Sequence, residues 1–181
     1  LMQCPWCPRT SSTQASNDFT QLWAVGDAKV LVTDAAGRRF GMAGSEFVEE
    51  IPDAYRTVLL TGLPGPSPTI YNLPISGTQT LLLNSGVITQ PTSMTVSQFG
   101  PDYAVTIDGI TLSPAKQDQV QIAADGKQVA YLASESKSIS LTLALANVPS
   151  VQAAATANGE SESYAFVISG AEVGANQAVL A

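Results

Sequence analysis

Residues 138–145 read SISLTLAL, and this stretch decides the fold class. Every second residue is apolar, so Ile139, Leu141, Leu143 and Leu145 share one phase. Side chains of a β-strand point alternately to the two faces of its sheet. The alternation therefore predicts a strand with one face in a core and the other in water.

Similar short segments recur along the chain, separated by turn signals rich in glycine, proline and aspartate. The strongest of these signals is Asp125-Gly126, a dipeptide typical of two-residue hairpin loops. Together they predict an all-β fold, an antiparallel β-sandwich. The expected strands are residues 22–25, 29–33, 38–42, 56–61, 69–73, 78–84, 92–99, 103–107, 120–124, 127–133, 138–145, 163–169 and 178–181.

Residues 43–56 are the best candidate for a helix. Ser45 can cap its start, and Pro52 limits it to about two turns.

The length of 181 residues allows one large β domain or two small ones, since a single core usually serves about 100–150 residues. Residues 1–16 are expected to form a lead-in, with two cysteines beside prolines and then a Ser/Thr/Gln spacer. The strands fall into two series, residues 17–101 and 102–181, divided at Gly100-Pro101. We expect two halves of one sandwich, or two small sandwiches in tandem.

The composition favours an extracellular or cell-surface protein. Charged residues make up only 13% of the chain, against about 25% in average globular proteins, and uncharged polar residues replace them. The net charge is −7 and the only basic doublet is Arg38-Arg39, so nucleic acid and anionic membranes are poor partners. No apolar run approaches the roughly 20 residues that span a bilayer. The first residues show no signal peptide, which indicates a processed protein, a fragment or a piece of a longer polypeptide.

The chain contains no histidine. This removes histidine general bases, the Ser-His-Asp and Cys-His mechanisms, and most zinc and copper sites. We therefore expect a protein that is not an enzyme, with no catalytic residues, no cofactor and no metal.

Three stretches carry a resemblance to a known kind of region: KVLVTDAAGRRFG (29–41), EEIPDAY (49–55) and YAVTIDGITLSPAKQDQVQIAADGKQVAY (103–131). As a set they resemble β-sandwich accessory regions of large secreted bacterial proteins, which often follow hydrolase-like or repeat domains. Here Ala36 stands near a usual proline and Asp53 stands where glycine is usual. The resemblance implies a non-catalytic extracellular module and implies no ligand.

Cys4 and Cys7 enclose Pro5 and Trp6, a spacing similar to that of thioredoxin-type redox centres. Such a centre needs a strand before it and a helix after it, and here Pro8 and a Ser/Thr spacer follow. A local disulfide or a terminal segment is the favoured reading, with redox catalysis as the minor alternative. We expect both cysteines to be dispensable for the fold, because so short a loop restricts the unfolded chain little.

Asp34, Gly37 and Arg38 lie in or beside one turn. Arg38 could grip a carboxylate or a sugar edge, but a turn capped by Asp34 and an ion pair of Arg38 with an acid are favoured. An acidic cluster follows, for which solvated surface is favoured over a glycosidase pair or a calcium site, since its members lie close together on one turn. The cluster comprises Glu46, Glu49, Glu50 and Asp53.

Five aromatic residues could stack on a sugar, but no aromatic stripe at strand spacing emerges. Tyr55 and Tyr71 lie near proline-rich loops and are the expected ligand-facing pair, whereas Trp23, Tyr103 and Phe166 are expected in the core.

The sequence thus predicts a structural or interaction module whose partners are neighbouring domains or copies of itself. One alternative is a subunit of an extracellular polymer or filament joined by strand addition. The other is a carbohydrate-binding accessory domain.

Overall fold

The computed structural model describes residues 19–59, 68–84, 88–148, 162–173 and 178–180. These ranges contain β-strands and no helix, so the predicted all-β fold is confirmed, and none of them holds a helix able to cross a membrane. The strands are β1 (Phe19–Gly26), β2 (Val30–Thr33), β3 (Arg39–Ala43), β4 (Glu46–Glu49), β5 (Tyr55–Val58), β6 (Thr69–Pro74), β7 (Gln79–Leu83), β8 (Thr92–Phe99), β9 (Tyr103–Leu112), β10 (Asp118–Ile122), β11 (Val129–Leu132), β12 (Lys137–Val148), β13 (Glu162–Val173) and β14 (Ala178–Leu180).

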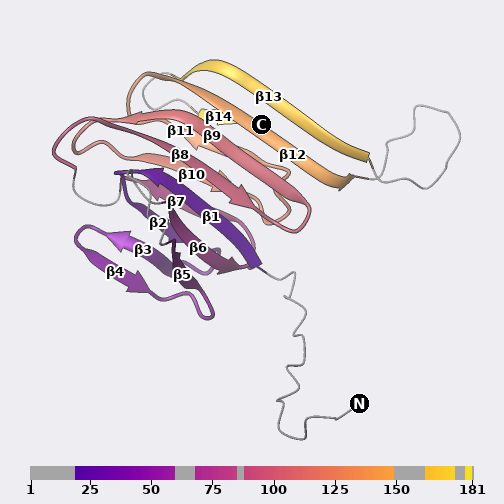
Figure 1. The fold of residues 1–181 in the computed structure, drawn as a ribbon, viewed down its shortest axis with the longest axis horizontal. Helices are drawn as coiled ribbons and strands as arrows, with labels where there is room; N and C mark the ends of the chain where they lie inside the picture. Colours follow the sequence, from indigo (N-terminus) through magenta and orange to yellow (C-terminus); the bar gives the residue numbers. More distant parts are fainter. Residues whose placement is uncertain (1–18, 60–67, 85–87, 149–161, 174–177, 181) are drawn as a thin grey trace, which may run out of the picture.

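The strands form two seven-stranded sheets (Figure 1). Sheet A has the order β13-β12-β9-β8-β1-β6-β5, and sheet B has the order β14-β11-β10-β7-β2-β3-β4. The pairs within each sheet are antiparallel, as in the predicted sandwich.

The core lies between the sheets and follows the period-two pattern of the sequence. Leu22 and Ala24 of β1 are buried while Gln21 and Val25 are exposed. The inward residues of both sheets join one hydrophobic cluster, which includes Leu22, Val32, Phe40, Tyr71, Leu81, Val96, Ile107, Val120, Tyr131, Ile139 and Leu141.

This cluster spans both series of strands. β8 and β9 pair directly across Gly100-Pro101, with Phe99 opposite Ala104. Each sheet contains strands from residues 17–101 and from residues 102–181. The described strands therefore form one sandwich.

The prediction of a helix over residues 43–56 is wrong. This segment holds β4, which pairs with β3, followed by a turn in which Asp53 has φ 62°. The Phe47 ring packs edge-on against Phe40 with centroids 5.3 Å apart, so a tertiary contact overrides the weak local helix signal.

Candidate functional site

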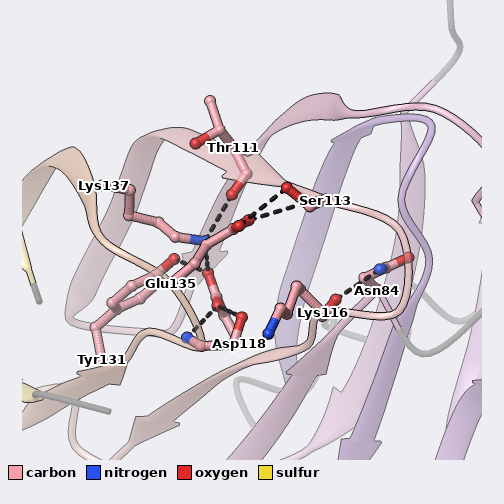
Figure 2. A network of polar contacts seen from close by, with 9 residues as sticks. Asn84, Thr111, Ser113, Lys116, Asp118, Tyr131, Glu135 and Lys137 are labelled. Carbon is pink, nitrogen blue, oxygen red and sulfur yellow. Dashed lines mark hydrogen bonds and ion pairs between the residues drawn. The ribbon is translucent and has the colours of Figure 1, made fainter. Parts of the chain in front are cut away.

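The most unusual feature of the interior is a buried ion pair between the sheets. Asp118 begins β10 in sheet B, and Lys137 begins β12 in sheet A. Their side chains are 0% and 1% exposed, and Lys137 Nζ lies 2.5 Å from Asp118 Oδ2 (Figure 2). A charge so deeply buried is costly unless it is paired and hydrogen-bonded, and each partner supplies this for the other.

The Asp118 carboxylate accepts further hydrogen bonds at both oxygens. Ser134 donates to Oδ1 from its backbone N–H and from its hydroxyl, each at 2.8 Å. The Tyr131 hydroxyl donates to Oδ2. Burial raises the pKa of Tyr131 above its ordinary value, and the neighbouring Asp118 carboxylate raises it further, so Tyr131 stays a donor.

Lys137 is held from a second direction as well. Its Nζ donates to the Thr111 carbonyl oxygen at 2.6 Å. Glu135 is also near, with Oε1 4.0 Å from Lys137 Nζ. The Glu135 carboxylate accepts hydrogen bonds of 2.9 Å from the Ser113 N–H and hydroxyl. Figure 2 shows both Glu135 and Asp118 next to the ammonium group. The cluster thus brings an amine into contact with one carboxylate and near another.

Sequence reasoning did not single out this cluster, although a signal for it was present. Lys137 is in phase with Ile139 and Leu141, and Asp118 is in phase with Val120 and Ile122. Extending the alternation of each strand by one step places both charged residues on the core face. Charges of opposite sign on two core faces predict a buried pair.

The structure places Asp34, Gly37 and Arg38 in a single turn between β2 and β3. Asp34 Oδ1 accepts from the N–H groups of Ala36 and Arg38 at 2.9 Å, and Gly37 has φ 78°. Arg38 Nη2 lies 2.7 Å from Asp34 Oδ2. Burial of Asp34 acts to raise its pKa, but the bonds from Arg38 and the backbone outweigh it and hold the pKa below its ordinary value. Arg38 is therefore occupied within its own turn.

The two tyrosines expected to face a ligand differ in position. Tyr55 is 55% exposed on edge strand β5. Tyr71 is 2% exposed, and its hydroxyl donates to the Val30 carbonyl oxygen at 3.3 Å. Burial raises the pKa of Tyr71 to about 12. The expectation for Tyr71 is corrected: the inward phase of β6, opposite Leu22 of β1, directs it into the core.

Of the residues expected in the core, Tyr103 is 5% exposed and lies there. Trp23 is not in the core; it lies half-buried in the outward phase of β1 and packs edge-on against Phe99 with centroids 6.1 Å apart. Phe19 and Tyr55 make a similar contact at 6.2 Å. The side chain of Phe166 is outside the described part of the chain, as are Cys4 and Cys7.

The outer face of sheet A around Trp23 also carries amides. Gln21 donates to Asn72 Oδ1 at 3.1 Å, and Asn72 donates to Thr57 Oγ1 at 2.9 Å. This face, which we call the aromatic face, comprises Phe19, Gln21, Trp23, Tyr55 and Phe99, with Asn72 buried among them at 3% exposure.

The acidic residues after β3 spread apart. Glu50 pairs with Arg39 at 2.5 Å on the surface, while Glu46 and Glu49 lie exposed on edge strand β4. Within the described ranges, no group of three acidic or cysteine side chains is placed to hold a metal ion.

A second polar cluster crosses the core near β8. Gln98 donates to Tyr103 Oη at 2.8 Å and to Gln79 Oε1 at 3.1 Å, and Gln79 donates to Thr20 at 3.4 Å. Gln98 Oε1 has no hydrogen-bond partner among the described residues.

Comparison of the chain with protein-family models, with curated proteins and with solved structures finds no match. Its class therefore comes from the fold: an all-β sandwich, here with a buried ionic cluster between the sheets.

Proposed function

We propose that this chain is a non-catalytic structural and interaction module of an extracellular or cell-surface bacterial protein. The observation that carries the proposal is the pair of Lys137 and Asp118, which ties β12 of sheet A to β10 of sheet B. Both oxygens of Asp118 are occupied by groups of the same chain, an arrangement suited to bracing two sheets. A braced sandwich serves as a rigid spacer or packing domain between neighbours.

The extracellular part of the proposal is supported by composition and resemblance. The charged fraction is 13%, and the stretch 29–41 resembles accessory regions of large secreted bacterial proteins. Fractionation of the source cells, followed with an antibody raised against this chain, tests it. We expect the antigen at the cell surface or in the medium, and its removal by protease added to intact cells. Antigen found only in the cytosol would contradict the proposal.

A carbohydrate-binding role is the second candidate, and the aromatic face favours it. Rings beside the exposed Gln21 amide suit neutral sugars, because the rings stack on the sugar and the amide bonds its hydroxyls. A glycan array tests this candidate directly. If a glycan binds through this face, Phe99→Ala should weaken binding at least about tenfold, as loss of about 1.4 kcal/mol would. Leu132→Ala, an equally exposed change on sheet B, should leave it unaltered.

A further inference from the structure

We propose that Lys137 and Asp118 are joined in the mature protein by an intramolecular isopeptide bond, which the folded chain forms by itself. This goes beyond the proposed function, since it assigns a covalent modification and needs no partner, ligand or cofactor.

The geometry places the reacting groups in contact. Nζ lies 2.5 Å from Oδ2, so it also lies beside the carboxyl carbon, Cγ, to which Oδ2 is bonded. The two side chains are 1% and 0% exposed, which excludes bulk water from the contact. The Thr111 carbonyl oxygen, 2.6 Å from Nζ, fixes the amine in place. Holding two groups at reacting distance removes most of the entropic cost of bringing them together.

The reaction is a condensation that needs no oxidant or reductant. In the first step a proton passes from the Lys137 ammonium to Asp118 Oδ2 along their direct contact, leaving an uncharged amine and a carboxylic acid. The Nζ lone pair then forms a bond to Cγ, and charge develops on Oδ1. The two Ser134 donors, each 2.8 Å from Oδ1, stabilise that charge.

Glu135 and Tyr131 complete the proton balance. Nζ carries one proton too many after attack, and Glu135, 4.0 Å away, is the nearest second carboxylate to accept it. The bond from Cγ to Oδ2 then breaks, with the Tyr131 hydroxyl donating a hydrogen bond to the departing oxygen. The proton held by Glu135 joins the leaving hydroxide, so the products are an amide and one water molecule, and Glu135 returns to its starting state.

The product links the two layers of the sandwich covalently. Asp118 belongs to sheet B and Lys137 to sheet A, so the bond closes residues 118–137 into a loop across the core. A closed loop of this kind restricts the unfolded chain, as a disulfide does, but it resists reduction.

The test is the intact mass of the purified full chain, measured after denaturation. We expect a mass lower than that of the sequence by one water molecule. Trypsin then locates the bond, because Lys137 is the last lysine or arginine in the chain. Cleavage after Lys137 should be lost, and the peptide of residues 117–127 should appear only joined to residues 128–181.

Two variants of Glu135 distinguish formation of the covalent bond from an unreacted buried ion pair. Glu135→Gln should fold, as judged by circular dichroism, yet keep the full mass of its sequence, and Glu135→Asp should restore part of the water loss. The exposed pair of Lys127 and Asp125, 3.8 Å apart and about 60% exposed, is an internal control, and cleavage after Lys127 should remain complete.

Full sequence mass in the folded wild-type protein, with normal cleavage after Lys137, would overturn the proposal. Loss of water confined to residues 128–181 would instead place the bond between Lys137 and Glu135 and would also overturn it. Neither outcome depends on where the protein acts or what it binds, so the proposed function stands or fails separately.

Discussion

The ring of Tyr103 lies directly against Gly126, so that a β-carbon at position 126 would sit 2.1 Å from Tyr103 Cγ. Tyr103 begins β9 in sheet A, and Gly126 lies in the turn between β10 and β11 of sheet B. The β10–β11 hairpin of sheet B therefore packs directly against β9 of sheet A. Gly126 also has φ 69°, a conformation that side chains other than glycine adopt at a cost.

Gly126→Ala should destabilise the fold strongly. The left-handed backbone and the overlap with Tyr103 together should lower the free energy of unfolding by about 2–4 kcal/mol. Urea unfolding measures the change. Gly37→Ala is the matched control, because Gly37 has φ 78° but a new β-carbon there would meet no atom within 4 Å apart from its chain neighbours, so only about 1 kcal/mol should be lost. Equal effects of the two changes would contradict the Tyr103 contact.

While Asp118 is a free carboxylate, Tyr131→Phe should destabilise the sandwich by about 1–3 kcal/mol, because that carboxylate would lose a buried donor while packing is kept. Thermal and urea unfolding measure this. Tyr55→Phe, on an exposed tyrosine, should change stability by less than about 0.5 kcal/mol. A Tyr131→Phe protein as stable as the wild type would show that the hydroxyl adds nothing to the cluster.

The free energy of unfolding should decrease in acid, and protonation of Asp34 should account for part of the decrease. Its folded pKa lies below the unfolded value of 3.8, so its contribution is fully present above that value and is lost as the pH falls through the folded pKa. Asp34→Asn should therefore destabilise the protein at neutral pH, by about 1–2 kcal/mol, and the gap to wild type should narrow in acid. Urea midpoints measured from neutral pH downward give the comparison, and a gap independent of pH would contradict the ion pair with Arg38.

Deletion of residues 176–181 should lower the melting temperature. β14 pairs with β11 through Ala178 to Leu180, so the deletion leaves the edge of β11 without its neighbour. A loss of 1 kcal/mol corresponds to about 2–4 °C for a chain of this size. Calorimetry measures the effect, and sedimentation at rising concentration shows whether copies associate.

If the shortened chain melts and sediments as the full one does, β14 contributes nothing. A polymer joined by strand addition would then have to use another strand, and β14 already pairs with β11 in its own sheet.

The alternation in SISLTLAL and its counterparts was enough to predict the all-β sandwich and the positions of most strands. Strand 92–99 was predicted with its observed bounds, because turn signals flank it on both sides. The helix predicted over residues 43–56 from the capping residue Ser45 does not form, and strand β4 lies there instead. The reason is that this segment pairs with β3 and packs Phe47 against Phe40, and such tertiary contacts cannot be read from the local sequence.

The sequence by itself determined the class of the fold, since side-chain phase is a property of each strand alone. Only the tertiary structure decided which strands pair and which residues meet across the core. Trp23 and Tyr71 both lie in strands of sheet A, but Trp23 points away from sheet B and Tyr71 points toward it, and only the packing of the two sheets decides this. Asp118 and Lys137 are 19 residues apart in different sheets, so their contact exists only because the two layers close over them. Burial then makes that contact consequential, because a charge removed from water must find its partner within the chain.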